Sequence, residues 1–168
     1  MKFFPTLAIC LIAITFSAGC RKEKELVVAP NAFPVEIGTK LAYLELAASP
    51  IERREGLRFR EKLNPDHGMA FIFKYPQRPT FWGKGIGFDT DLGHFDASGK
   101  LLGTVTIPSE SPAARSMHEG VLISLMMPFE WFARNGVRPG ARIKMEGIYD
   151  ALRARGIPID DYPFESGD

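Results

Sequence analysis

The chain has very few cysteines, and this scarcity limits both its stabilisation and its chemistry. Of its 168 residues only Cys10 and Cys20 are cysteines, and both lie among the first twenty positions. We expect Cys10 to be removed with a leader and Cys20 to carry lipid, which leaves no disulfide framework and no cysteine nucleophile. The fold must therefore be stabilised by packing, and 13 phenylalanines supply apolar side chains for it.

The chain also lacks an excess of charge of either sign. It has 21 Lys and Arg against 20 Asp and Glu, a formal net charge of +1, and the loss of a leader containing Lys2 lowers this to zero. A nucleic-acid partner would require a basic face. We therefore expect no nucleic acid among the partners of this protein.

No apolar stretch near the N-terminus is long enough for a comfortable membrane span. The apolar run at residues 7–16 is followed by Ser17, Ala18 and Gly19, and then by Cys20; a transmembrane helix needs roughly twenty residues. A positive start, a short apolar run and small residues are typical of a secretory signal peptide. Small residues before a cysteine also resemble the lipobox of bacterial lipoproteins, although Ser17 stands where leucine is usual.

These features predict an exported, membrane-anchored protein. We expect residues 1–19 to be a signal peptide and Cys20 to be the lipidated first residue of a lipoprotein on the periplasmic face of a bacterial membrane. Arg21 favours the outer membrane, by resemblance to sorting in Gram-negative bacteria. The alternatives are a soluble exported protein cut nearby and an uncleaved anchor.

Residues 20–34 have the composition of a tether. Alternating charges at its start and two prolines near its end separate Cys20 from the next patterned segment, and full extension of residues 21–34 would reach at most about 45 Å. The alternative is that residues 26–29 add an edge strand.

Residues 35–147 predict a single β-rich α+β domain with about seven short strands and two short helices. The clearest local signals are a capping box at Ser49–Glu52, whose helix ends near Gly56, and a hairpin formed by residues 91–95 and 100–107 around a tight turn. Buried strands are expected at 68–74 and 121–126, a partly exposed strand at 40–45, an irregular strand at 80–88, a polar loop at 108–119, a helix at 129–135 and a last strand at 141–146. A small, partly closed barrel or sandwich would bury these runs. Residues 148–168 are predicted to be a loosely held tail, with a short helical segment possible at its start.

An ordered set of motifs in this segment resembles a known family. The chain carries GLRFREKL at 56–63, GMAFIF at 68–73, FWGK at 81–84, DLGHFDASGKLLG at 91–103 and GVRPGARI at 136–143. In this order and spacing they resemble the bacterial and archaeal family called domain of unknown function 192. The resemblance implies a compact β-rich domain, often exported or tethered, and implies no reaction. Only Lys84 remains of the run Met-Lys-Asn-Thr that family members commonly carry after the FW pair, and the acidic residue that often follows the final PG is Ala141 here.

The residues best suited to ligand binding are Arg60, Phe81, Trp82 and Lys84. Aromatic faces beside cations could line a shallow pocket for a sugar, a peptide or a small anion, and we add Asp91 to these ligand-binding candidates. The alternative is that Phe81 and Trp82 point to opposite sides of a strand and the cations are solvated. The alternating glycines at 83, 85 and 87 are better explained by bulges or close backbone approach than by phosphate binding.

Catalytic and metal-binding patterns are weak. His67, His94 and His118 fit no local ligand motif, so we expect hydrogen-bonded or surface histidines and no metal or cofactor. Asp89, Asp91 and Asp96 do not have the spacing of a calcium loop, and Asp96 suits the hairpin turn. Ser116 lies beside His118 without the strand-turn-helix elbow of a serine nucleophile.

The sequence therefore predicts an uncharacterised envelope lipoprotein that binds a small ligand or a neighbouring envelope protein without catalysis. The alternative is an exported hydrolytic or metal-dependent enzyme that uses His94, His118 and Asp91. A third hypothesis is a structural accessory of a larger complex.

Overall fold

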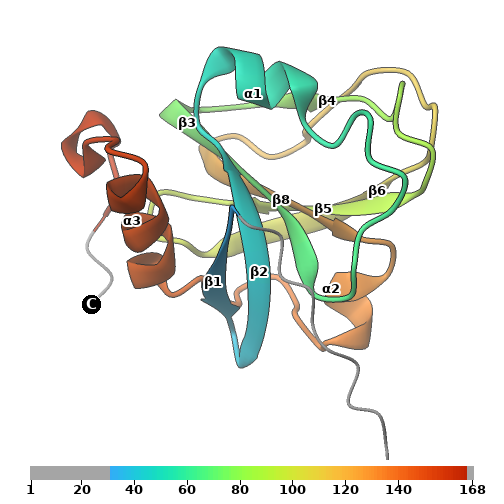
Figure 1. The fold of residues 1–168 in the computed structure, drawn as a ribbon. Helices are drawn as coiled ribbons and strands as arrows, with labels where there is room; N and C mark the ends of the chain where they lie inside the picture. The colour runs from blue at the N-terminus through green and yellow to red at the C-terminus, as the bar shows by residue number, and fades with distance from the viewer. Residues whose placement is uncertain (1–30, 166–168) are drawn as a thin grey trace, which may run out of the picture.

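The fold is built on one mixed six-stranded sheet. The computed structural model of the chain describes residues 31–165 (Figure 1). The strand order is β1-β2-β3-β8-β5-β6, and only β2 and β3 pair in parallel. The strands span Ala32–Ile37 (β1), Lys40–Ala47 (β2), His67–Gln77 (β3), Thr90–Phe95 (β5), Leu101–Ile107 (β6) and Val121–Pro128 (β8). Thr80–Phe81 (β4) and Ala114–Arg115 (β7) form a second, two-stranded sheet.

The predicted α+β class is confirmed, and so are its two clearest local motifs. Ser49 caps helix α1 (Pro50–Glu55) by accepting a hydrogen bond from the Glu52 amide at 3.2 Å, and the Glu52 carboxylate accepts one from the Ser49 amide at 2.8 Å. The turn between β5 and β6 is stabilised by Asp96 Oδ1, which accepts hydrogen bonds from the amides of Ser98 and Lys100. Both motifs depend on residues that are close in sequence, which is why the sequence predicts them.

The sheet does not close into a barrel. The sequence predicts a small, partly closed barrel or sandwich, and the barrel is not formed. β1 and β6 remain the two edges of the sheet, and residues 142 and 143 join them at one end. The Gly38 amide donates to the Arg142 carbonyl at 2.8 Å, and the Ile143 amide donates to the Gly99 carbonyl at 2.9 Å. The strand predicted at 141–146 is therefore reduced to two isolated bridges.

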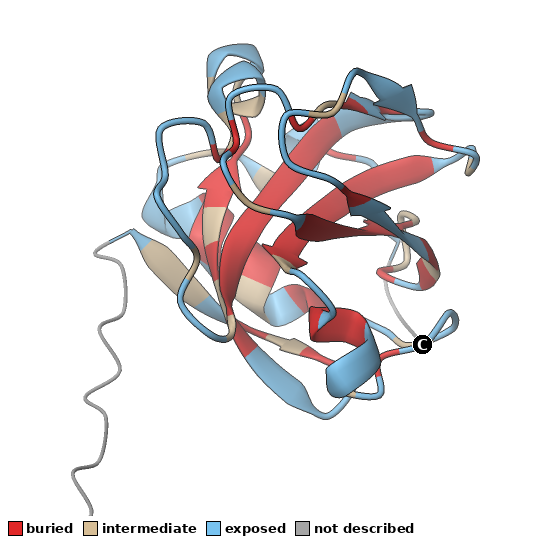
Figure 2. Ribbon diagram, turned by 90° about the vertical axis from the view of Figure 1, so that its right-hand side faces the viewer, coloured by how far each residue is buried: buried red, intermediate tan, exposed pale blue. Residues whose placement is uncertain are grey.

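Apolar side chains are buried on both faces of the sheet, and the central strand β8 shows the alternation. Ile123 and Leu125 belong to a core cluster shared with helices α2 and α3. Met126, the residue after Leu125, belongs to a second cluster, on the side of α1 and β4. In Figure 2 the central strands are buried throughout, whereas α1 is mostly exposed. The second cluster is thus covered by thin elements that leave room for pockets.

The C-terminal residues as far as 165 are packed on the core, so the helical segment considered possible at the start of the tail is present, whereas the loose packing expected after it is wrong. Helix α3 spans Met145–Ala154 and buries Ile148, Ala151 and Leu152; it lies beside β1 (Figure 1). A 3-10 turn at Ile159–Asp161 (η1) follows, and Tyr162 is buried in the same cluster. The domain therefore needs residues beyond 147.

Two other boundaries differ from the sequence analysis. Strand β1 begins at Ala32, inside the segment predicted as a tether. Helix α2 is confined to Trp131–Arg134, shorter than the predicted 129–135, and buries Trp131 and Phe132, whereas Phe129 before it is 45% exposed. The third α-helix, α3, takes in the last two residues of the strand predicted at 141–146 and most of the short helical segment considered possible at the start of the tail.

The predicted signal peptide, Cys20, Arg21 and the possible strand at 26–29 lie outside the described residues. Within residues 31–165 none of the helices combines the length and the apolar character needed to span a bilayer.

Candidate ligand-binding site

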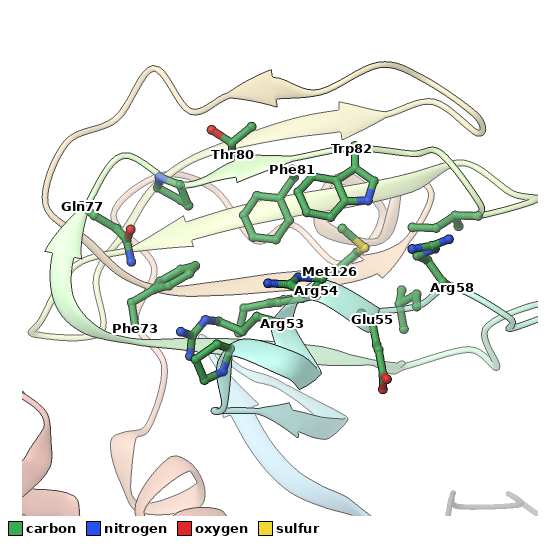
Figure 3. Close-up of a pocket in the computed structure, with 16 residues that line it drawn as sticks. Arg53, Arg54, Glu55, Arg58, Phe73, Gln77, Thr80, Phe81, Trp82 and Met126 are labelled. Carbon is green, nitrogen blue, oxygen red and sulfur yellow. The ribbon is translucent and has the colours of Figure 1, made fainter.

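A pocket of about 290 Å³ lies between α1 and β4, above the second core cluster (Figure 3). Its apolar wall comes from strands β3, β4 and β8. Its other wall comes from α1 and the turn that follows it. The lining side chains are Pro50, Arg53, Arg54, Glu55, Leu57, Arg58, Phe71, Phe73, Gln77, Pro79, Thr80, Phe81, Trp82, Ile86 and Met126, together with Gly56.

Aromatic rings form the apolar wall. The rings of Phe71 and Phe81 meet edge to face with centroids 5.0 Å apart, and both side chains are buried. Trp82 is half-buried and lies along the same wall as Phe81 in Figure 3. The structure therefore places both aromatics at the pocket, so Trp82 offers an apolar face to a bound molecule.

Three arginines line the opposite wall, and one of them is already engaged. Arg53 donates hydrogen bonds to the carbonyls of Ala48 and Ile72, and its guanidinium lies 5.5 Å from the ring centroid of Phe73. Burial lowers the pKa of Arg53 below its ordinary value. Arg53 thus fastens α1 to the sheet.

Arg54 and Arg58 are the cations left for a ligand. Both are exposed at the pocket, and within the described part of the chain neither guanidinium forms a hydrogen bond or an ion pair. Arg58 lies 5.4 Å from the ring centroid of Phe59, which is 87% exposed. Two guanidiniums without carboxylate partners can bind an anion in a bidentate manner.

Helix α1 is held in place by its cap and by a contact from the C-terminal helix. Glu52 closes the capping box and also forms an ion pair with Arg155, whose guanidinium donates to the Leu46 carbonyl at 2.7 Å. Burial raises the pKa of Glu52, but hydrogen bonds from Ser49 and Arg155 outweigh this and lower it overall. The wall that carries Arg54 is therefore held at the N-terminal turn of α1.

Of the five ligand-binding candidates, only Phe81 and Trp82 line the pocket beside α1, and the other three lie elsewhere. Arg60 forms an ion pair with Glu45 and lines a separate cleft near α3. Lys84 is exposed outside the lining of these pockets, and Asp91 lines a shallow cleft beside α2.

The glycines that follow Trp82 have structural roles. A Cβ atom at position 83 would lie 2.0 Å from the Pro108 carbonyl oxygen, and Gly85 has φ of +82°. Close backbone approach therefore explains Gly83, as the sequence predicts, and a left-handed conformation explains Gly85.

Two of the three histidines meet in a second cavity, of about 160 Å³, on the other side of Phe81. The rings of His94 and His118 have centroids 6.2 Å apart, and the ring of Phe81 lies 6.0 Å from that of His94. His94 is 2% exposed, and its Nδ1 lies 2.9 Å from Ser124 Oγ. Burial, followed by the influence of His118, lowers the pKa of His94 to about 4. His67 stacks on Tyr43 elsewhere in the fold.

Asp91 does not join these histidines, because successive side chains of β5 alternate between the two faces of the sheet. It accepts a hydrogen bond from Thr106 Oγ1 at 2.9 Å, and burial raises its pKa above the ordinary value. The three-residue site of the alternative enzyme hypothesis is therefore not assembled. Residues 31–165 also contain no cluster of three or more His, Cys, Asp or Glu side chains suited to a metal ion.

The sequence analysis missed the arginines of the pocket. The available signal is the density of arginine around the capping box, in the run ERREGLR at 52–58. None of the side chains of α1 is buried. The arginines on such a helix must therefore lie in solvent or in a cleft. The aromatic wall comes from distant strands, so its meeting with these arginines needs the fold.

The fold and the pocket define a class: an α+β domain with an open mixed sheet and an apolar pocket lined by arginines. The sequence profile of domain of unknown function 192, described as an uncharacterised ACR, matches residues 34–145. Because the match covers more than half of the chain, the chain belongs to this family.

Solved structures agree with this assignment. The chain is similar to a protein from Sinorhizobium meliloti 1021 described as a candidate transcription regulator, with a TM-score of 0.63 and 26% identity over 67% of this chain and 92% of that one. It is also similar to a protein of unknown function from Novosphingobium aromaticivorans DSM 12444, with a TM-score of 0.62 and 23% identity over 67% and 84% of the two chains. A search of curated proteins finds no match.

Proposed function

We propose that this protein is an exported, lipid-anchored module that binds a small amphipathic anion in the pocket between α1 and β4, without catalysis. The ligand class is an apolar body of modest size joined to a carboxylate or phosphate. The leader-like N-terminus and Cys20 support the location.

The observation that carries the proposal is the division of the pocket into an apolar wall and a cationic wall. Phe71, Phe81 and Met126 present hydrocarbon and thioether surface. Arg54 and Arg58 face them, and among residues 31–165 no carboxylate pairs with either guanidinium. A pocket of about 290 Å³ suits a small molecule better than a folded partner. Among the residues that the structure describes, Glu55 alone contributes a carboxylate to the pocket lining, against three arginines, so the electrostatics of the pocket favour an anion.

The charge of this chain does not favour DNA binding, the activity suggested by the description of the Sinorhizobium protein as a candidate regulator of transcription. Phosphate contacts along DNA require a surplus of positive charge, whereas this chain has 21 Lys and Arg against 20 Asp and Glu. Two guanidiniums beside an apolar wall match a single small anion better.

A direct test compares three probes that share one hydrocarbon tail. Octanoate, octanol and octylamine are titrated into the full chain, and heat and Trp82 fluorescence are recorded. We expect octanoate to bind more tightly than the other two, because only its head group pairs with guanidinium. The fluorescence change should disappear in Trp82→Phe, since Trp131 is 2% exposed and bonded to Asp66.

Variants locate the binding. Arg54→Ala and Arg58→Ala should each weaken octanoate by about tenfold, as expected for a charge-assisted hydrogen bond of roughly 1.5 kcal/mol. Arg138→Ala, which removes an exposed arginine away from the pocket, is the matched control and should change nothing. Equal binding of octanoate and octylamine, or equal loss in Arg138→Ala, would refute the proposal.

A further inference from the structure

We propose that the cavity between β5, β6 and β7 is a copper(I) site, with His94 and His118 as nitrogen ligands and Met117 as a thioether ligand. This cavity is distinct from the pocket beside α1, because the ring of Phe81 lies between the two and lines both. The inference does not depend on the proposed anion-binding function.

The separation of the two imidazoles fits one shared ion. A nitrogen ligand lies about 2 Å from a metal ion, and its ring centroid about 1 Å further. Two rings on opposite sides of one ion therefore have centroids about 6 Å apart, and those of His94 and His118 are 6.2 Å apart. Both rings line the same cavity of about 160 Å³.

His94 is oriented by a buried partner. Its Nδ1 lies 2.9 Å from Ser124 Oγ, and Ser124 is fully buried on β8. Metal-binding histidines commonly use one ring nitrogen for such a hydrogen bond, which fixes the ring and leaves the other nitrogen for the metal. Because Ser124 has no access to solvent, it is a positioning residue and not a nucleophile.

Gly103 provides the space in which His118 lies. Gly103 is the cross-strand partner of His94, and a Cβ atom at position 103 would lie 2.3 Å from His118 Nε2. Any side chain there would displace this ring. Gly103, His94 and Ser124 are cross-strand neighbours on β6, β5 and β8. Because Gly103 has no side chain, the ring of His118, from the loop after β7, can lie next to His94.

The remaining lining selects a soft monovalent ion. Met117 is one of the residues that line the cavity, and its side chain is 85% exposed, so no core packing holds its thioether away from an ion bound there. Imidazole and thioether ligands suit copper(I), which accepts a low coordination number. The lining contains no carboxylate for a hard divalent ion, and Arg115 at the cavity disfavours higher charge. The other walls are apolar, from Leu92, Val105 and Ile107.

The experiment uses the full chain with Cys10→Ser and Cys20→Ser, so that no thiol competes for copper. Copper(I) is titrated under anaerobic conditions against bicinchoninate, a coloured copper(I) chelator. We expect one copper(I) per chain to be withdrawn from the chelator. A chain that withdraws none would overturn the proposal.

Single substitutions in this background assign the ligands. His118→Ala removes a half-buried loop side chain with little risk to the fold, and should weaken copper(I) by more than about 100-fold, beyond the loss typical of an outer partner. Ser124→Ala should weaken it by about 10- to 100-fold, because the ring of His94 loses its orientation. His67→Gln, which removes the histidine outside the cavity, is the matched control and should bind as tightly as its parent. Binding by His118→Ala equal to that of His67→Gln would refute the site.

A spectroscopic readout separates ligation from a general structural effect. X-ray absorption of the copper(I)-loaded chain should show nitrogen scatterers and one sulfur scatterer, and the sulfur should vanish in Met117→Leu while the nitrogens remain. An unchanged sulfur signal in Met117→Leu would exclude Met117, and a spectrum without imidazole nitrogens would overturn the proposal entirely.

Discussion

His94 shows how a single buried side chain links stability to pH. It lies on strand β5, between β8 and the edge strand β6, is 2% exposed, and has a pKa lowered to about 4, mainly by burial. In the unfolded chain its pKa is near the ordinary value of 6.5, so the unfolded state takes up this proton first as the pH falls. The contribution of neutral His94 to stability is therefore complete above about pH 6.5 and lost progressively between 6.5 and 4.

We predict that the metal-free chain loses up to about 3 kcal/mol of unfolding free energy through this residue between pH 7 and pH 4. Urea unfolding of the full chain and of His94→Gln at a series of pH values measures it, and the difference between the two curves isolates His94. Asp91 acts in the opposite direction, because burial raises its pKa, but it is present in both proteins and cancels. A difference that does not vary with pH would contradict the prediction.

For single residues, the sequence predicts roles that depend on neighbours in the chain better than it predicts which distant side chains meet in the fold. Asp96 and Gly99 are interpreted correctly because a tight turn involves neighbours only. His94 and His118 fit no local ligand motif and are paired only in the alternative enzyme hypothesis, because their approach depends on the position of β7 and on the absence of a side chain at Gly103. Asp91 is grouped with them although strand alternation places it on the opposite face.

Among the elements, α3 departs furthest from expectation. The residues just before α3 favour an extended conformation, which is why the sequence predicts a strand at 141–146. The helix is stabilised by packing on β1 and on the first core cluster. Local propensity alone therefore predicts a strand at 141–146 and only a possible short helix at the start of a loose tail. By contrast, α1 carries its own start signal, and the sequence predicts it correctly.

We predict that Leu152→Ala destabilises the domain by about 2–5 kcal/mol, the range for truncating a fully buried leucine. Leu152 is 0% exposed on α3, whereas Leu41 on β2 is 49% exposed, so Leu41→Ala is the matched control and should cost less than about 1 kcal/mol. Chemical denaturation of both variants measures the two losses. Equal small losses would mean that α3 is not part of the cooperative core.

At the scale of the whole molecule, the class of the fold follows from the sequence, but its closure does not. Alternating strands and a hairpin establish an α+β domain, whereas the joining of β1 and β6 through residues 142 and 143 rests on contacts between distant parts of the chain. The pocket has the same origin. Arginines from a short capped helix meet aromatics from β3 and β4 only because α1 packs across the second core cluster.

The last prediction concerns how the whole molecule is attached to its membrane. When the full chain is expressed in a Gram-negative bacterium, we expect it to incorporate radiolabelled palmitate and to partition into the detergent phase of Triton X-114. Cys20→Ser should abolish both, because no thiol then remains in the expected mature protein to carry lipid. Cys10→Ser is the matched control, since Cys10 lies within the expected leader, and it should keep the label. Label that persists in Cys20→Ser, or unlabelled wild-type protein in the aqueous phase, would remove the anchor from the proposed function while leaving the pocket between α1 and β4 to be tested on its own.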